Sequence, residues 1–405
     1  MEWIFPLANR IKHYAWGSPE WIPALLGRPN PSGEPWAELW MGVHPGGPSV
    51  LEYQGREITL GDLIQKDPVR WLGGEAGRNF GALPFLFKVL AAGKPLSIQA
   101  HPNLEQARQG WERENREGLA PDDPRRNYKD ANHKPEILCA LGPFRAMCGF
   151  REPETIFRLL EAFLGEAGTL LQEACAPLGG ALNPAGASLR DFFGALFGLS
   201  PKARKALTDH ALEAGPRLER QVPEYAAEWE LTARFAECYP DDPGVIAPLY
   251  LNLLALEPGE AIYLPAGVLH AYVRGLGVEL MANSDNVLRG GLTPKHIDME
   301  ELVRILRFVP FKPEILRPGG NCFTYPGESR EFALSAIRGG GGEGPFPVPG
   351  PAIVMVSSGK AVFKKNGEKM ALGRGASAFI PAGADPSFEG SCAIYAAGLP
   401  ADRPG

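Results

Sequence analysis

The sequence predicts a mainly β protein with a helical insertion. Its 405 residues contain 49 glycines and 40 prolines spread along the whole length, a density that favours short strands joined by tight turns. Apolar residues recur at helical spacing over one long stretch, at about 153–235. Because the chain is too long for one ordinary core, we expect two or three domains.

The bulk composition narrows the class of protein. The hydrophobic fraction of 44% and the charged fraction of 22% are typical of a soluble globular protein. A net charge of −6 without a basic run argues against nucleic acid or an anionic membrane as a partner. No apolar run approaches the roughly 18 residues of a membrane span, and the first residues lack the features of a signal peptide. Six scattered cysteines without C-x-x-C spacing suit a reducing compartment, so we expect a cytoplasmic protein.

The part before the helical stretch is expected to form most of a β-rich core. Strands are predicted at 10–17, 37–43, 84–90, 96–101 and 133–141. Helices are predicted at 60–72, ended by a Gly-Gly pair, and at 105–116. The connections between these segments are short.

The helical insertion carries clear start signals. Ser188 is expected to cap one helix, and Ser200-Pro201 to open another as its N-cap and first residue. The histidine of this stretch, His210, is surrounded by polar residues, so we expect it on a solvated face rather than in a site.

After the insertion, a short internal repeat indicates a duplicated barrel. The segment 256–267 has the pattern of a strand pair and leads into His270. The segment 375–383 matches 259–267 in the register of its Gly, Pro, Ala and Gly residues, but no histidine follows it. The repeat predicts two related barrels, of which the first alone holds a metal.

The candidate metal ligands come from three segments. Strand alternation would place Gln99 and His101 on one face, with Ser97 further along it. Glu136 on a neighbouring strand would add a carboxylate, and His270 is the candidate for a second imidazole. Such a mixed nitrogen and oxygen set fits zinc best, and manganese, iron and cobalt remain open.

Several long motifs, in the correct order, are similar to those of type I phosphomannose isomerases, which belong to the cupin superfamily. They are LPFLFKVLAAGKPLSIQAHP at 83–102, NYKDANHKPE at 127–136, LPAGVLHAY at 264–272 and GVELMANSDNVLRGGLTPKHID at 277–298. The N-terminal pieces KHYAWG and AELWMGVHP are similar too. Two features depart from the family: Asn103 and Leu104 follow Pro102 where many members place a lysine, and the helical insertion is short.

The resemblance implies an architecture of two cupin-like jelly-roll β-barrels plus an all-α domain. We expect the N-terminal part of the catalytic barrel at 1–150, the helical insertion at 151–238 and the rest of the catalytic barrel at 239–310. A C-terminal barrel without metal ligands is expected at 311–405. The protein is expected to be a monomer.

The resemblance also implies an activity: a zinc-dependent aldose-ketose isomerase that interconverts mannose 6-phosphate and fructose 6-phosphate. It implies that the four candidate ligands bind one zinc ion per chain and that Arg289 is the active-site arginine. In the sequence, Arg289 precedes Gly290-Gly291 in a predicted turn, and Lys295 can face the same cavity, so either can bind phosphate.

The residue that moves the proton stays open among three candidates, Lys134, Glu279 and His133. Ser97 and Trp16 are expected in the substrate cleft on the strength of the resemblance. The remaining histidines, His13, His44 and His296, are interpreted as hydrogen-bonded loop or core residues.

Two alternatives to the isomerase remain. A metal-dependent cupin oxygenase would need an open metal shell but no pair of cations at 289 and 295. A non-catalytic sugar-binding cupin would tolerate the loss of metal donors, which the intact set argues against.

Overall fold

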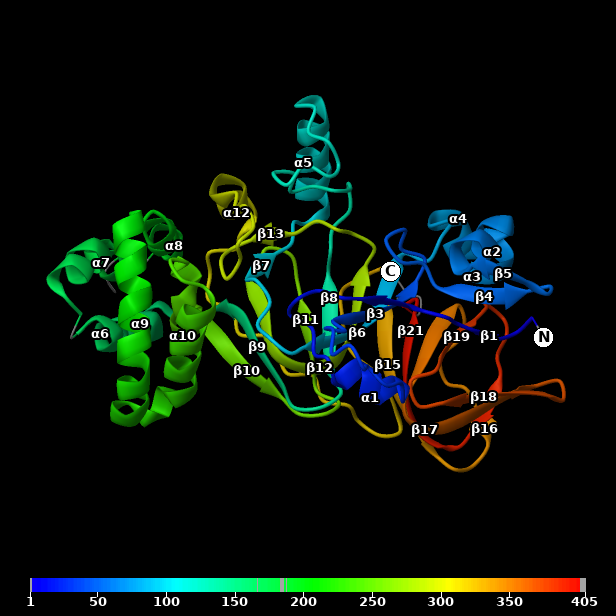
Figure 1. Ribbon diagram of the computed structural model, residues 1–405. Coiled ribbons are helices and arrows are strands. Elements are labelled where there is room, and N and C mark those ends of the chain that lie inside the picture. The colour runs from blue at the N-terminus through cyan, green and yellow to red at the C-terminus, as the bar shows by residue number, and fades with distance from the viewer. Residues whose placement is uncertain (1, 166, 183–185, 187, 401–405) are drawn as a thin grey trace.

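The computed structural model describes residues 2–165, 167–182, 186 and 188–400. Within them the chain is a mix of helices and antiparallel sheets, as the sequence predicts. Figure 1 shows most of the long helices at one end of the molecule and the C-terminal strands at the other. The outer ends of the first and last predicted domains, residues 1 and 401–405, lie outside the described residues. No helix in these described stretches combines the length and the apolar character that crossing a membrane requires.

The first sheet has ten strands, and its long strand β12 (His270–Ala282) pairs with four of the others. The ten strands are β2 (Arg10–Lys12), β3 (Glu38–Gly42), β6 (Phe85–Ala92), β7 (Gln99–Ala100), β8 (Glu136–Ala140), β9 (Phe144–Phe150), β10 (Leu251–Leu256), β11 (Ala261–Leu264), β12 and β13 (Leu288–Arg289). Strand β12 pairs with β7 and β9 near its start and with β6 and β8 in its second half. At the change of partners lies Gly275, with φ of 148°, where an added Cβ would lie 2.4 Å from Cδ2 of Phe144. Glycine is required at this bend for both reasons.

The second sheet has nine strands and includes the first strand of the chain. They are β1 (Phe5–Pro6), β14 (Cys322–Thr324), β15 (Ala333–Gly340), β16 (Gly344–Pro345), β17 (Ala352–Lys365), β18 (Glu368–Gly373), β19 (Ser377–Ile380), β20 (Ser387–Glu389) and β21 (Ser391–Gly398). Phe5 of β1 pairs with Phe379 of β19, so the N-terminus differs from the predicted assignment of 1–150 to the first barrel. Phe87 and Ile353 belong to one apolar cluster, which joins the two sheets.

Five α-helices build the insertion. They are α6 (Pro153–Leu164), α7 (Thr169–Ala181), α8 (Leu189–Phe197), α9 (Pro201–Gln221) and α10 (Ala226–Cys238), with the short 3₁₀ helix η1 (Pro223–Tyr225) before α10. The predicted caps are confirmed, because Ser188 accepts from the backbone N–H of Asp191 and Ser200 from that of Ala203. The expectation for His210 is wrong. Its Nε2 lies 2.6 Å from the carbonyl oxygen of Phe163, and the two rings are 4.8 Å apart, because the residue faces a neighbouring helix.

The remaining elements surround the sheets. They are α1 (Trp21–Leu26), α2 (Leu60–Lys66), α3 (Pro68–Leu72), α4 (Gly74–Asn79), α5 (Leu104–Arg116), η2 (Pro243–Ile246), α11 (Ala247–Tyr250), α12 (Met299–Ile305) and the paired strands β4 (Val50–Tyr53) and β5 (Arg56–Thr59). The single helix predicted at 60–72 is two helices. Pro68 disfavours a helical conformation at Asp67, and the Asp67 side chain caps α3 by accepting from the N–H of Arg70.

The internal repeat has one backbone conformation in both copies. Gly259 and Gly267 flank β11 with φ of 90° and 77°, and Gly375 and Gly383 flank β19 with φ of 81° and 69°. Residues other than glycine rarely adopt these angles. The spacing of glycines in the sequence therefore corresponds to two strands bounded by the same kind of turn.

Candidate metal centre and its surroundings

Three buried side chains converge where β7, β8 and β12 begin or end. His270 and Glu136 are the first residues of β12 and β8, and His101 directly follows β7. Nε2 of His101 lies 3.4 Å from Oε1 of Glu136, and Nε2 of His270 lies 3.3 Å from Oε2 of the same carboxylate. All three are at most 2% exposed. One ligand atom from each lies within 4.8 Å of the others, close enough to share a metal ion.

The hydrogen bonds of the two imidazoles fix which nitrogen faces the centre. Nδ1 of His101 donates to the carbonyl of Asn286 at 2.8 Å, and Nδ1 of His270 donates to that of Val268 at 3.1 Å. The Nε2 lone pairs are thus free, and neither Nε2 atom nor Oε2 of Glu136 has a hydrogen-bond partner among the described residues. Unpartnered buried polar atoms are costly. Their convergence, with the other ring nitrogen bonded to a carbonyl, is the arrangement of a metal site.

Burial and charge keep His101 and Glu136 in the protonation states that a metal needs. Burial lowers the pKa of His101 to about 4, so the ring is neutral at pH 7. Burial raises the pKa of Glu136, but Lys134 and His101 outweigh it and hold the pKa well below its usual range. His101 therefore offers a neutral nitrogen and Glu136 a carboxylate, beside the imidazole of His270.

The predicted strand at 96–101 is shorter than expected. Regular pairing is confined to Gln99 and Ala100 of β7, and Gln99 is opposite both His270 of β12 and Arg289 of β13. The half-buried Gln99 thus lies one strand away from a histidine of the cluster. Ser97, also half-buried, lies before the strand, where the backbone of Ile98 bonds to the glycines that follow β13.

Two of the candidates for proton transfer, His133 and Lys134, lie in the segment before β8 and contact different parts of the protein. The strand begins at Glu136 instead of 133, and Lys134 in the preceding loop places its Nζ 3.1 Å from Oε1 of Glu136. His133 points elsewhere, since its Nε2 lies 2.8 Å from Oε1 of Glu331, which precedes β15. Of the two, Lys134 is beside the cluster and His133 is held by the C-terminal part of the chain.

The third candidate, Glu279, belongs to a buried polar network that the sequence analysis missed. Its two oxygens accept from Nζ of Lys88 at 2.9 Å and from the hydroxyl of Tyr272 at 2.7 Å. Lys88 also lies 3.6 Å from Glu38, whose other oxygen accepts from the Trp40 indole at 2.6 Å. One signal for Lys88 was present: it is a lysine inside the apolar strand FLFKVLAA, where a charge requires a buried partner.

Two cations lie near each other without a carboxylate. Arg289 lies in strand β13, not in a turn as predicted, because its backbone pairs with Gln99. Burial lowers the pKa of Arg289, and burial together with the charge of Arg289 lowers the pKa of Lys295. No described residue forms an ion pair with Arg289, and the nearby acid in the sequence, Asp285, lies 3.3 Å from Nε2 of His44. This pair can bind an anion.

The outlying histidines and Trp16 have separate surroundings. His44 is buried, and its Nδ1 accepts from the N–H of Gly46 at 3.1 Å; His13 bonds to the carbonyl of Pro35 at 2.9 Å. His296 differs from the expectation, because it is exposed and bonds to no described residue. Trp16 is half-buried and stacks on Tyr14 at 5.7 Å.

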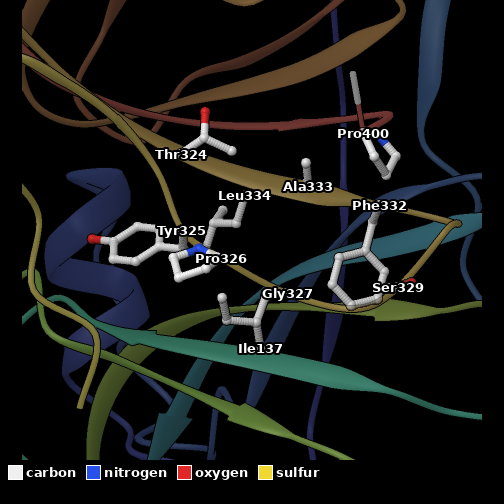
Figure 2. A pocket seen from close by; sticks show the side chains of 10 residues that line it. All are labelled: Ile137, Thr324, Tyr325, Pro326, Gly327, Ser329, Phe332, Ala333, Leu334 and Pro400. Carbon is white, nitrogen blue, oxygen red and sulfur yellow. The ribbon is translucent and has the colours of Figure 1, made fainter. Parts of the chain in front are cut away.

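A separate cavity lies on the other side of β8. Figure 2 shows Ile137 of β8 beneath the segment from Tyr325 to Leu334. The cavity between them has a volume of about 190 Å³. Glu136 and Ile137 are neighbours on a strand, so their side chains point to opposite faces. The residues lining this cavity are apolar or uncharged, and it is not the metal centre.

Comparisons with known proteins agree with this geometry. Residues 4–153 match the family model of the phosphomannose isomerase type I catalytic domain. The chain is 39% identical to the mannose-6-phosphate isomerase of Salmonella typhimurium, over 94% of this chain and 95% of the relative. The chain belongs to the mannose-6-phosphate isomerase family. Another member, from Homo sapiens, is 37% identical over 76% of this chain and 74% of its own length.

Solved structures of mannose 6-phosphate isomerases have the same fold as this chain. A crystal structure of one with zinc bound gives a TM-score of 0.90 at 37% identity and covers 98% of this chain and all of its own. A Salmonella typhimurium structure bound to fructose 6-phosphate and zinc gives 0.89 over the same share of this chain. At this identity and coverage, the family assignment extends over both sheets and the helical insertion.

Proposed function

We propose that this protein interconverts D-mannose 6-phosphate and D-fructose 6-phosphate and that Gln99, His101, Glu136 and His270 hold one zinc ion. The observation that carries the proposal is the convergence of three buried, unpartnered donor atoms in a chain of this family. Two imidazoles and a carboxylate suit zinc, and Gln99, opposite His270 on the neighbouring strand, is the candidate for a fourth donor. When bound, zinc would supply a Lewis acid that polarises a sugar oxygen.

Arg289 and Lys295 would bind the phosphate of the substrate. Phosphate carries close to two negative charges at pH 7, and these two cations have no competing carboxylate among the described residues. Arg289 is half-buried and its backbone is fixed by β7. A guanidinium at this position could bind phosphate oxygens in a bidentate manner. Ser97 and Trp16, both half-buried, would contact the sugar.

The isomerisation moves one proton between C1 and C2 of the sugar and another between O1 and O2, through an enediol. Two groups would carry these protons. Lys134, beside Glu136, would donate to a substrate oxygen. Glu279, whose oxygens accept from Lys88 and Tyr272, would accept a proton from carbon. Only the group that removes the proton from carbon controls the exchange of the C2 hydrogen with solvent. We therefore expect solvent deuterium uptake at C2 to be lower in Glu279→Gln than in Lys134→Met.

The finer architecture is part of the same proposal. The two larger sheets would be two jelly-roll barrels of the cupin type, with the insertion at 151–238 as an all-α domain between the two parts of the first barrel, 1–150 and 239–310. The exception is β1, which pairs with β19 of the second sheet. The second barrel, 311–405, would lack metal: Pro386 occupies the place in the repeat that His270 holds in the first copy. We further propose a cytoplasmic monomer. The relatives give no support to an oxygenase or a non-catalytic sugar-binding protein.

A coupled assay tests the function. Purified protein is supplied with mannose 6-phosphate, and fructose 6-phosphate is measured before chelation, after chelation and after zinc is restored. We expect turnover to disappear with chelation and return with zinc. No turnover in the zinc-loaded protein would refute the proposed reaction, and undiminished turnover after zinc removal is verified would refute the metal requirement.

A further inference from the structure

A second cavity, which none of the proposed metal ligands lines, lies where the helical insertion meets the first sheet. It has a volume of about 630 Å³ and is lined by α10, by the paired strands β9 and β12 and by Trp21 of α1. Three arginines line it, Arg145, Arg234 and Arg274, against a single carboxylate, Glu230. We call it the arginine cavity. In a chain of net charge −6, this is a local excess of positive charge.

Two of the arginines face each other across the sheet. Arg145 of β9 and Arg274 of β12 are direct partners in the antiparallel ladder, at the point where the register of the two strands shifts. Like charges in opposite positions destabilise a strand pair. A compensating anion between them would remove that cost.

The one carboxylate of the cavity is already engaged. Oε2 of Glu230 lies 3.2 Å from Nη1 of Arg145. Arg234 lies one turn further along α10 and is half-buried, yet no described residue forms a hydrogen bond or ion pair with it. Arg274 lies over the ring of Trp21 at 5.8 Å and has no carboxylate partner in the described part of the chain. Two guanidinium groups therefore remain without counter-charge in one cavity.

We propose that the arginine cavity binds a small phosphorylated compound with at least two negative charges. Guanidinium groups from α10 and β12 match phosphate oxygens in geometry and charge, and the half-buried Trp21 provides a flat apolar wall. The volume is that of an ordinary small-molecule site. Two sources share this chemistry: inorganic phosphate, and a phosphate ester whose planar ring contacts Trp21.

Isothermal titration calorimetry on the full chain, with ADP and with inorganic phosphate as probes, tests the proposal. We expect saturable binding of one probe molecule in the arginine cavity at low ionic strength, in addition to any phosphate group that Arg289 and Lys295 bind. Arg234→Ala and Arg274→Ala should each weaken it about tenfold, the value of one charge-assisted hydrogen bond. Arg234→Lys, which keeps the charge, should retain part of the affinity. Tighter binding of ADP than of phosphate would identify the ring-bearing ester as the ligand class, and equal binding would identify the phosphate group alone.

Two controls separate this cavity from the metal centre and from general charge effects. Arg220→Ala removes an exposed arginine from α9 and should leave the affinity unchanged. Arg289→Ala removes the proposed substrate cation and should leave unchanged the binding that Arg234→Ala and Arg274→Ala weaken, whatever its effect on turnover. Equal affinity in Arg234→Ala and wild type, loss of binding in Arg289→Ala alone, or no saturable binding of either probe would overturn the proposal. Because no described residue forms a hydrogen bond or ion pair with Arg234, its variant is expected to melt as the wild type does.

Discussion

Replacing Lys88 by methionine should destabilise the protein strongly, because the ammonium group neutralises two buried carboxylates. Lys88 is 5% exposed, and its Nζ lies 2.9 Å from Oε2 of Glu279 and 3.6 Å from Oε1 of Glu38. Burial lowers the pKa of Lys88, but Glu279 and Glu38 raise it by more, so the side chain is charged at every physiological pH. Methionine has a similar volume and removes the charge alone.

The expected cost is about 3–5 kcal/mol at pH 7, the usual effect of removing one partner from a buried ion pair. Glu279 keeps the Tyr272 hydroxyl and Glu38 keeps the Trp40 indole, so the variant should still fold. Without Lys88, the two buried carboxylates lose their shared positive partner, and protonation of either would relieve that cost. The variant's deficit should therefore be largest at neutral pH and should shrink on acidification.

Urea unfolding of wild type and Lys88→Met at pH 7 and pH 5 measures this effect. The double variant Lys88→Met with Glu279→Gln removes one of the stranded charges and should recover part of the loss. A single variant as stable as wild type at pH 7, or one whose deficit stays constant from pH 7 to pH 5, would refute the electrostatic reasoning.

Three further predictions concern other parts of the chain. Arg289→Ala should lower kcat/KM by about 10–100-fold, and Arg289→Lys by less, because a charge-assisted contact to phosphate is lost; steady-state kinetics with Arg220→Ala as control check this. Burial raises the pKa of Glu331, but His133 and Ser329 lower it to about 2, so its stabilising effect is present above the unfolded pKa and lost as the pH falls towards 2. The deficit of Glu331→Gln in thermal midpoint should accordingly fade on acidification below about pH 4.3, and a deficit that grows would contradict this. Ser200→Ala should cost about 1 kcal/mol in urea unfolding through loss of the α9 cap, whereas Ser32→Ala on an exposed loop should cost little.

The sequence predicted those parts of the fold that depend on local chemistry. The start of β12 at His270 follows from the Pro-Ala-Gly turn before it, and the caps at Ser188 and Ser200 follow from a side chain that bonds to the backbone three residues ahead. The break between α2 and α3 at Asp67 was missed by the prediction of one helix at 60–72. It is equally local, since Pro68 restricts the conformation of the residue before it.

Long-range pairings were not predictable in the same way. β1 joins the C-terminal sheet, and His133 bonds to a carboxylate 198 residues away, neither of which leaves a periodic signal in either segment. The convergence of His101, Glu136 and His270 was predictable because they are polar residues at the ends of apolar strands. Lys88 carried a comparable signal, a charge within an apolar strand, but Glu38 and Glu279 as its partners depend on how three strands align.

The measurement that most directly tests the proposed centre is the zinc content per chain together with turnover, in His270→Ala and in the matched variant His210→Ala. His210 is a half-buried histidine of the helical insertion, so its replacement changes an imidazole without touching the cluster. We expect wild type and His210→Ala to bind one zinc ion per chain and to isomerise mannose 6-phosphate, and His270→Ala to lose both properties. Retention of zinc and of turnover in His270→Ala would contradict the proposed metal centre.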